Sequence, residues 1–314
     1  AYINIFWRTL ANLTQDGLAI LPQSKIPVLH KEIMNQCDIN DGLIDNVLDD
    51  PWSCSPNLEA LSCNKNKSSN CFTDDELLVV EKLYNGAFLS DGIRASWGVP
   101  KGAELGLMRY LLNKKGEIGQ FEPLAQDRLR YTWFDYDPGP KYNPIEFNLD
   151  RDYPRLFTKG FLQAPNNPDL TEYKARGSKL IIYQGLNDML NTEPLINYVK
   201  KVKMITDEEN QSSDFLRLYL IPGMNHCRGG TGVDQFDWMK HIRNWVEKDE
   251  APQSVVGYKL KPAKAKYRTW PISIKEIIKT RPIYDYPNTA HYHGSGDHTH
   301  HSNFKPHKLK KFNN

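Results

Sequence analysis

Two apolar segments that end in polar turns constrain the fold of this chain more than any other feature. The first, Leu180–Gly185, leads into a turn that carries Asp188. The second, Phe215–Ile221, leads into a glycine-rich loop, residues 222–230, that carries His226. Asp188 and His226 lie 38 residues apart, which leaves room for one helix between two parallel strands. The carboxyl ends of such strands meet at one edge of a sheet, so an acid and a base are expected side by side.

Regular alternation of strand and helix patterns surrounds these two turns. Apolar periodicity predicts strands over 179–185 and 215–221, and helices over about 193–205 and 234–248. We therefore predict an α/β fold, with residues 171–265 forming the C-terminal half of an α/β-hydrolase catalytic domain. The chain contains no Gly-x-Ser-x-Gly sequence. It therefore carries a candidate acid and base without the nucleophilic serine that would complete a triad.

The segments outside this half-domain are less regular. Residues 1–36 have apolar residues at helical spacing and are predicted to connect the catalytic domain to a lid domain over 37–170. Within that lid, Thr73-Asp-Asp-Glu76 has the pattern of a capping box, and the helix it opens should end at Asn85-Gly86. Residues 87–169 are irregular and aromatic, which favours an insertion over a binding cleft. The His-rich tail, 266–314, is expected to lie along the surface or be disordered.

Composition excludes several classes of partner. A net charge of +2 over 314 residues gives no basic surface for nucleic acid. No apolar run approaches the roughly 18 residues of a membrane-spanning helix, so we expect no membrane partner either.

The chain begins at Ala1 without the basic and apolar regions of a signal peptide. We expect that it is N-terminally incomplete or processed.

The five cysteines are unevenly placed. Cys37, Cys54, Cys63 and Cys71 lie within one stretch, and Cys227 stands alone. A local, even-numbered group favours disulfides in a secreted protein. A zinc site is the alternative, although the spacings lack the C-x-x-C pairs that are typical of zinc ligands. Cys227 then needs a partner outside this chain, or it is a free thiol.

An acidic loop follows the first cysteine. Asp38, Asp41 and Asp45 alternate with residues whose carbonyls could join them, such as Leu43 and Val47. Carboxylate and carbonyl oxygens are the ligands that Ca²⁺ takes, and a glycine after the second aspartate permits a tight turn. The loop is not an EF-hand, because its glycine is misplaced and no glutamate closes it. The alternative is a solvated acidic turn that binds no metal.

Simpler interpretations also exist for the other polar candidates. His226 could be a hydrogen-bonded loop residue, and Asp188 could be the N-cap of the following helix. The tail histidines could bind a transition metal, although a solvated polar tail is the simpler interpretation; they are His291, His293, His298, His300 and His301.

These segments together resemble the tannase and feruloyl esterase family, a secreted branch of the α/β-hydrolases. The similarity extends over most of the chain in several ordered pieces. They are the acidic loop from Cys37 to Asn46, the entry into the first strand from Asn167 to Gly185, the acid turn from Gly185 to Asp188, the histidine loop from Pro222 to Gly230, Trp245–Pro252, and Arg281-Pro282 through Gly296.

The resemblance implies a role for each candidate residue. Asp188 would be the triad acid and His226 the general base. Asp38, Asp41 and Asp45, with the carbonyls of Leu43 and Val47, would hold a structural Ca²⁺. The implied disulfides are Cys37–Cys54 and Cys63–Cys71, and Cys227 would bond a cysteine beside the serine in an N-terminal segment outside this chain.

The sequence also departs from the family pattern. Two tail positions where the family has cysteines hold Tyr284 and Lys305, which is consistent with the loss of one disulfide. The family's Tyr-His-Gly before the acid turn is Tyr-Gln184-Gly here, from which we expect little effect on the chemistry.

The resemblance implies a carboxylic ester hydrolase that acts on small aromatic, phenolic esters by a Ser-Asp-His mechanism, with the serine outside this chain. In the alternative, the chain is a non-catalytic, calcium-stabilised fragment or pseudo-hydrolase that only binds a partner or ligand.

Overall fold

The computed structural model describes residues 2–65, 68–110, 123–156, 166–190, 192–206, 214–262 and 271–310. The chain divides into two compact units. Unit 1 comprises Ala1–Ile33, Pro56–Asn166 and Met189–Asn191, and unit 2 comprises Met34–Ser55, Asn167–Asp188 and Thr192–Asn314. Every candidate catalytic and cation-binding residue lies in unit 2.

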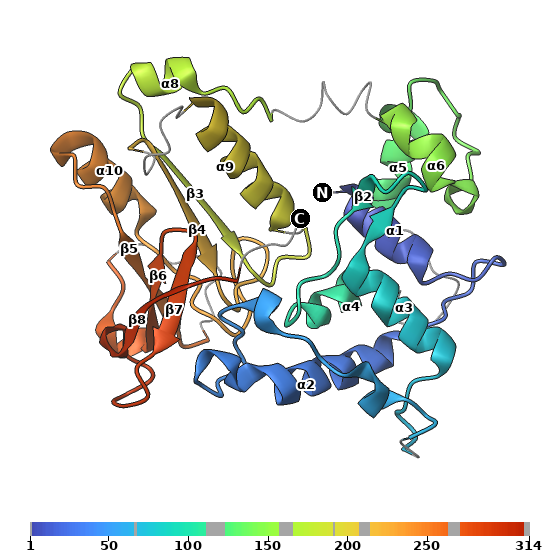
Figure 1. The fold of residues 1–314 in the computed structure, drawn as a ribbon, viewed down its shortest axis with the longest axis horizontal. Coiled ribbons are helices and arrows are strands. Elements are labelled where there is room, and N and C mark those ends of the chain that lie inside the picture. The colour runs from blue at the N-terminus through green and yellow to red at the C-terminus, as the bar shows by residue number, and fades with distance from the viewer. Residues whose placement is uncertain are drawn as a thin grey trace. The chain divides into compact units, whose positions relative to one another are not determined.

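Unit 2 is built on the expected pair of parallel strands. β3, Leu180–Gly185, pairs in parallel with β4, Leu216–Ile221, from Leu180↔Leu216 to Gly185↔Ile221 (Figure 1). The connection contains α9, Glu193–Thr206, and α8, Thr171–Ala175, precedes β3. The predicted strands and connecting helix are therefore present to within a residue or two.

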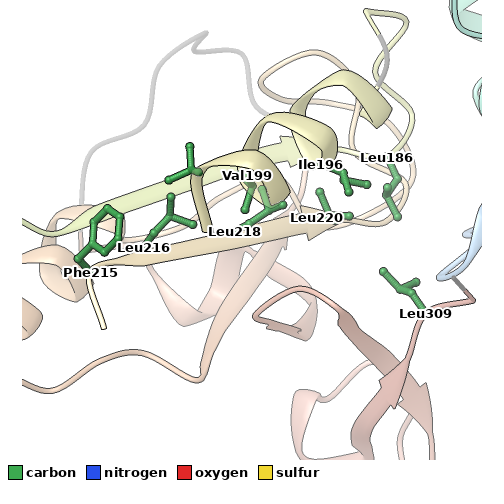
Figure 2. Packing of buried hydrophobic residues seen from close by; sticks show 9 residues of the cluster. Leu186, Ile196, Val199, Phe215, Leu216, Leu218, Leu220 and Leu309 are labelled. Atoms are coloured by element: carbon green, nitrogen blue, oxygen red, sulfur yellow. The ribbon is translucent and has the colours of Figure 1, made fainter. Parts of the chain in front are cut away.

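α9 covers one face of this strand pair. Leu216, Leu218 and Leu220 alternate along β4 and are buried, which places them all on the face toward the helix. The helix contributes Ile196, Val199 and Val202 at helical spacing, and Figure 2 shows most of these side chains interleaved between helix and strands. Each such side chain contributes about 1.5–3 kcal/mol by leaving water, so this layer holds the helix against the strand pair.

The other face of the strand pair packs aromatic residues against α10, Trp238–Lys248. The Trp238 ring stacks on that of Tyr183, with centroids 4.7 Å apart, and lies 5.3 Å from that of Tyr219. Tyr183 and Tyr219 occupy paired positions of β3 and β4, which puts both on the face opposite the leucines. The helix begins four residues later than predicted, with Asp237 accepting a hydrogen bond from the amide of Lys240 as its N-cap.

In the segment 266–314, which was expected to lie along the surface or be disordered, the described residues 271–310 form paired strands and are not disordered, although many of them are exposed. β5, Ser254–Leu260, pairs antiparallel with β6, Ile277–Tyr284, and β7, Asn288–Tyr292, pairs antiparallel with β8, Phe304–Lys308. A bridge between Tyr219 and Asp285 links this part to β4. Backbone pairing with β5 and the burial of Thr280, Arg281 and Ile283 explain why its polar composition was misleading.

Unit 1 is mainly helical. The described part of residues 87–169, which leaves out 111–122 and 157–165, consists of short helices and one short strand pair. The two-stranded hairpin pairs β1 with β2, and the core of unit 1 packs the buried Phe6, Leu129, Phe134 and Phe147 together. Thr73 and Glu76 form the predicted capping box. The elements are α1 Tyr2–Ala11, α3 Asp74–Asn85, β1 Ala87–Phe88, β2 Arg94–Ser96, α4 Leu107–Tyr110, α5 Pro123–Arg128 and α6 Leu149–Asp152, while α2, Ile26–Cys37, begins in unit 1 and ends in unit 2.

The unit boundaries differ from the predicted domains in one important respect. The acidic loop was assigned with residues 37–170, but residues 34–55 belong to unit 2. The reason lies in contacts that are distant in sequence: Asp45 pairs with Arg281, and the Thr289 hydroxyl donates to the carbonyl of Asp49. Within the described residues, no helix is both long and apolar enough to cross a membrane.

Candidate functional site

The structure brings Asp188 and His226 into direct contact. Nδ1 of His226 lies 2.8 Å from Oδ2 of Asp188, within hydrogen-bond distance. The Asp188 side chain is 3% exposed and that of His226 is 57% exposed. A buried carboxylate thus orients an imidazole whose other face is open to solvent. This is the relation between acid and base in a catalytic triad.

The two turns that carry these residues are joined through their backbones. The amide of Asn187 donates to the carbonyl of Met224 at 3.0 Å, and the amide of Leu186 donates to Ile221 at 2.9 Å. Gly185 is needed for this approach, because a Cβ there would lie 2.1 Å from the Met224 oxygen. The acid turn and the histidine loop therefore form one rigid pair at the ends of β3 and β4.

The histidine loop is also closed on itself. The amide of Asn225 donates to Gly229, and the amide of Gly229 donates to the carboxylate of Asp234 at 2.8 Å. Cys227, directly after the histidine, is exposed, has a φ of 60° and is a free thiol. The other four cysteines form Cys37–Cys54 and Cys63–Cys71, the pairs that the resemblance implied.

Gln184, from which sequence reasoning expected little effect on the chemistry, contacts the candidate acid. The side-chain amide of Gln184 donates to Oδ2 of Asp188 at 3.1 Å, the same oxygen that His226 approaches. The replacement of the family's histidine by Gln184 therefore adds a neutral donor to the candidate acid. Its place at the end of a strand, four residues before Asp188, was the available signal.

In the structure the acidic loop extends to Asp49, and its backbone amides surround its own carboxylates. Asp38 accepts from the amides of Asn46 and Val47, at 2.8 and 3.2 Å. Asp41 accepts from Leu43 with Oδ1 and from Asp49 with Oδ2. The Cys37–Cys54 disulfide closes this loop, with Cα atoms 5.4 Å apart.

Two cations from β6 face the same loop. Nη2 of Arg281 lies 2.5 Å from Oδ2 of Asp45, and Nζ of Lys279 lies 3.4 Å from the same oxygen. Nη1 of Arg281 lies 3.4 Å from Oδ2 of Asp49. Sequence reasoning missed Lys279 and Arg281, since more than 200 residues separate the loop from β6. It also left out Asp49, which lies in the loop itself.

Burial disfavours the ionised form of the carboxyl groups in the loop. It raises the pKa of Asp41 to about 8, with the nearby charge of Asp49 acting in the same direction. Burial also raises the pKa of Asp49 to about 7, against the opposing effect of Arg281. The pKa of Asp38 is raised for the same reason, whereas burial lowers the pKa of Lys279. Carboxylates in such surroundings are stabilised in their ionised form by additional positive charge.

The loop has the chemistry of a hard-cation site. Asp49 is 2% exposed, and its Oδ1 has no hydrogen-bond partner among the described residues. If all four aspartates, including Asp38 and Asp41, are ionised, Lys279 and Arg281 leave two negative charges uncompensated. The donors are oxygens, as Ca²⁺ requires. No three acidic, histidine or cysteine side chains in the described residues converge as a preformed metal cluster, so ligation needs side-chain turns or the carbonyls of the loop.

One hydrogen bond connects the acidic loop to the histidine loop. The hydroxyl of Thr231 donates to the carbonyl of Asn46 at 2.8 Å. Asn46 has a φ of 60° and lies between Asp45 and Val47, at the centre of the candidate cation site. This bond links the acidic loop to the segment that follows His226.

The described tail histidines form two close ring pairs, but they do not form a group of three that could bind a metal ion. His291 and His307 have ring centroids 5.2 Å apart on paired strands, and His300 and His301 are 4.4 Å apart. His300 instead caps the short helix His301–Asn303 through its ring nitrogen. No triad of metal ligands forms among the described histidines.

Comparison with known proteins identifies the family of the chain. The family model described as tannase and feruloyl esterase matches residues 2–121 and 154–306, which is most of the chain. The chain belongs to the tannase and feruloyl esterase family. Its solved relatives in this family share the fold: feruloyl esterase B from Aspergillus oryzae superposes with a TM-score of 0.79 at 23% identity, and covers 97% of this chain and 61% of that one. Tannin acyl hydrolase from Aspergillus niger gives 0.70 at 19% identity, covering 97% and 57%.

Curated members of the tannase and feruloyl esterase family are similar over the same region. Mono(2-hydroxyethyl) terephthalate hydrolase of Piscinibacter sakaiensis is 26% identical over 316 aligned residues, covering 88% of this chain and 50% of that protein. Feruloyl esterase B of Aspergillus niger is 24% identical, covering 74% and 46%. The chain thus spans about half the length of the curated relatives it matches. Its fold is that of esterases of the α/β-hydrolase type.

Proposed function

We propose that this chain supplies the acid and the base of a serine-type carboxylic ester hydrolase that acts on small aromatic esters. The observation that carries the proposal is the 2.8 Å contact between Nδ1 of His226 and the buried carboxylate of Asp188. The named relatives act on feruloyl, tannin acyl and terephthalate esters, each of which has an aromatic acyl group.

The contact determines what each residue would do. Asp188 accepts the Nδ1–H of His226, which leaves Nε2 as the proton acceptor. Nε2 would remove the proton from a serine hydroxyl as the oxygen attacks the ester carbonyl, and Asp188 would stabilise the imidazolium that forms. The same imidazolium would then protonate the departing alcohol. Backbone amides near the serine would bind the oxyanion.

The serine itself is proposed to come from a segment outside these 314 residues. Three observations support this. The sequence has no nucleophile elbow, Cys227 presents an exposed free thiol beside the base, and β3 pairs on one edge only within the described residues. We propose that a parallel strand extends the sheet at β3 and that a cysteine beside the serine bonds Cys227.

The acidic loop is proposed to hold a structural Ca²⁺ through Asp38, Asp41 and Asp45, with the carbonyls of Leu43 and Val47. The cation would supply rigidity to the loop. The protein's own contribution is the bond from Thr231 to Asn46, through which an ordered loop restrains the histidine segment. The two disulfides support a secreted location.

The test is complementation. The chain is co-expressed with a segment that carries Gly-Cys-Ser-x-Gly from a family member, and hydrolysis of methyl ferulate is measured. We expect turnover by the complex, none by the chain alone, and loss of turnover in H226A and D188N. A disulfide to Cys227 should appear by non-reducing mass spectrometry. Turnover by the chain alone that is abolished in H226A would overturn the proposal that the nucleophile lies elsewhere.

The second candidate is a non-catalytic binding fragment, which the missing serine favours. It predicts an intact complex that takes up an aromatic ester without hydrolysing it. Binding of methyl ferulate with unchanged affinity in H226A and no detectable product would support this alternative.

A further inference from the structure

The two basic residues of β6 that face the acidic loop are held very differently. The Arg281 side chain is 5% exposed, bridges Asp45 and Asp49, and has its guanidinium 4.1 Å from the centroid of the Phe304 ring. The Lys279 side chain is 17% exposed, and within the described part of the chain its ion pair with the loop is with Asp45 alone. Arg281 is therefore a fixed part of the loop's framework, whereas Lys279 is attached at one point.

We propose that Lys279 is an internal counter-ion of the acidic loop that competes with a divalent cation for Asp45. This inference rests on the proposed calcium site and adds to it the residue that sets its affinity. A cation bound by Asp45 would lie about 2.3–2.6 Å from one of its oxygens. The ammonium of Lys279 lies 3.4 Å from Oδ2 of the same carboxylate, so the two positive charges would repel each other at short range.

The competition has two opposite consequences. Without calcium, Lys279 compensates part of the charge on Asp45 and stabilises the loop. With calcium, the same ammonium lowers the affinity, because its attraction to Asp45 must be weakened as the cation binds. Replacing Lys279 by an uncharged residue should therefore tighten calcium binding and at the same time lower the stability of the calcium-free protein.

The experiment compares the full chain with K279M by isothermal titration with CaCl₂ and by thermal unfolding in EDTA and in calcium. For K279M we expect a Kd lower by about 10-fold, from charge repulsion reduced by the surrounding carboxylates. We also expect a lower Tm in EDTA and a larger rise in Tm on adding calcium. K279R keeps the charge and should bind calcium within about twofold of wild type.

The matched control is K179M. Lys179 has a 17% exposed side chain and pairs with Asp249 at 3.6 Å, away from the acidic loop. Its replacement should leave the calcium Kd unchanged. If K279M does not fold, K279Q carries the same expectation.

Two results would overturn the inference. An unchanged or weaker calcium Kd in K279M, with wild type binding calcium, would refute the role of Lys279 and leave the calcium site in place. Absence of binding at millimolar calcium in wild type and in K279M would refute the site itself. Neither result depends on ester hydrolysis, so the proposed reaction is tested separately.

Discussion

Substitution of Gly185 by alanine should separate the candidate acid from the base. Gly185 ends β3, and a Cβ built on it lies 2.1 Å from the carbonyl oxygen of Met224 and 2.7 Å from that of Asn225. Real Cβ atoms are essentially never found closer than 3.0 Å to such atoms, so the Met224 carbonyl must move by about 0.9 Å. Both atoms it meets are backbone, which cannot rotate away as a side chain could.

The displacement falls on the histidine loop. His226 is two residues beyond Met224, and its Nδ1 is 2.8 Å from Asp188. A shift of this size lengthens that contact beyond the roughly 3.2 Å limit of a good N–H···O bond. We expect G185A to lower the free energy of unfolding by about 1–3 kcal/mol, the usual cost of overpacking, and to abolish turnover in the complemented enzyme.

Urea denaturation followed by tryptophan fluorescence measures the stability change. The downfield NMR proton of the His226 Nδ1–H reports the contact with Asp188. G177A is the control: Gly177 has a φ of 74° and no atom within 4 Å of a built Cβ, so it loses stability by backbone strain alone and keeps the downfield proton. If G185A retains both the wild-type proton signal and the wild-type stability, the reasoning from this close approach is wrong.

Three further perturbations test other contacts of unit 2. T231V removes the hydroxyl that bonds to the acidic loop and should lower the free energy of unfolding by about 1 kcal/mol. The esterase activity of the complex should then lose its sensitivity to EDTA. Equal sensitivity in T231V and wild type would contradict the link. Burial raises the pKa of Asp285, so the folded state binds the proton of this carboxyl group more tightly than the unfolded state does. The stability of the protein should therefore fall as the pH rises above about 4. D285N keeps an oxygen acceptor for the amide of Leu218 and should flatten this fall in thermal melts across pH 4–8. The double variant C37A/C54A should lose about 3 kcal/mol in chemical denaturation, because the disulfide closes a loop of 17 residues; no change would mean that the loop is ordered without it.

The local elements of this protein were predictable because their signals are local. Short apolar runs placed β3 and β4, and the 38-residue spacing placed Asp188 and His226 at neighbouring strand ends. The Thr73–Glu76 capping box depends only on residues three apart. Family resemblance added the two disulfide pairs, which spacing alone left open.

The tertiary structure decided where the acidic loop belongs and what balances its charge. Nothing near Asp45 in the sequence indicates a contact with Lys279 or Arg281. Both residues lie on β6, a strand that the polar composition of the C-terminal segment did not predict. Strand pairing between β5 and β6 turns those basic side chains toward the loop. Burial then strengthens the electrostatic interaction between their charges and the carboxylates of the loop. Sequence thus determined which side chains could act as acid, base and cation ligands. Long-range packing determined which of them meet, because a contact between distant segments depends on the register of strands and not on any local pattern.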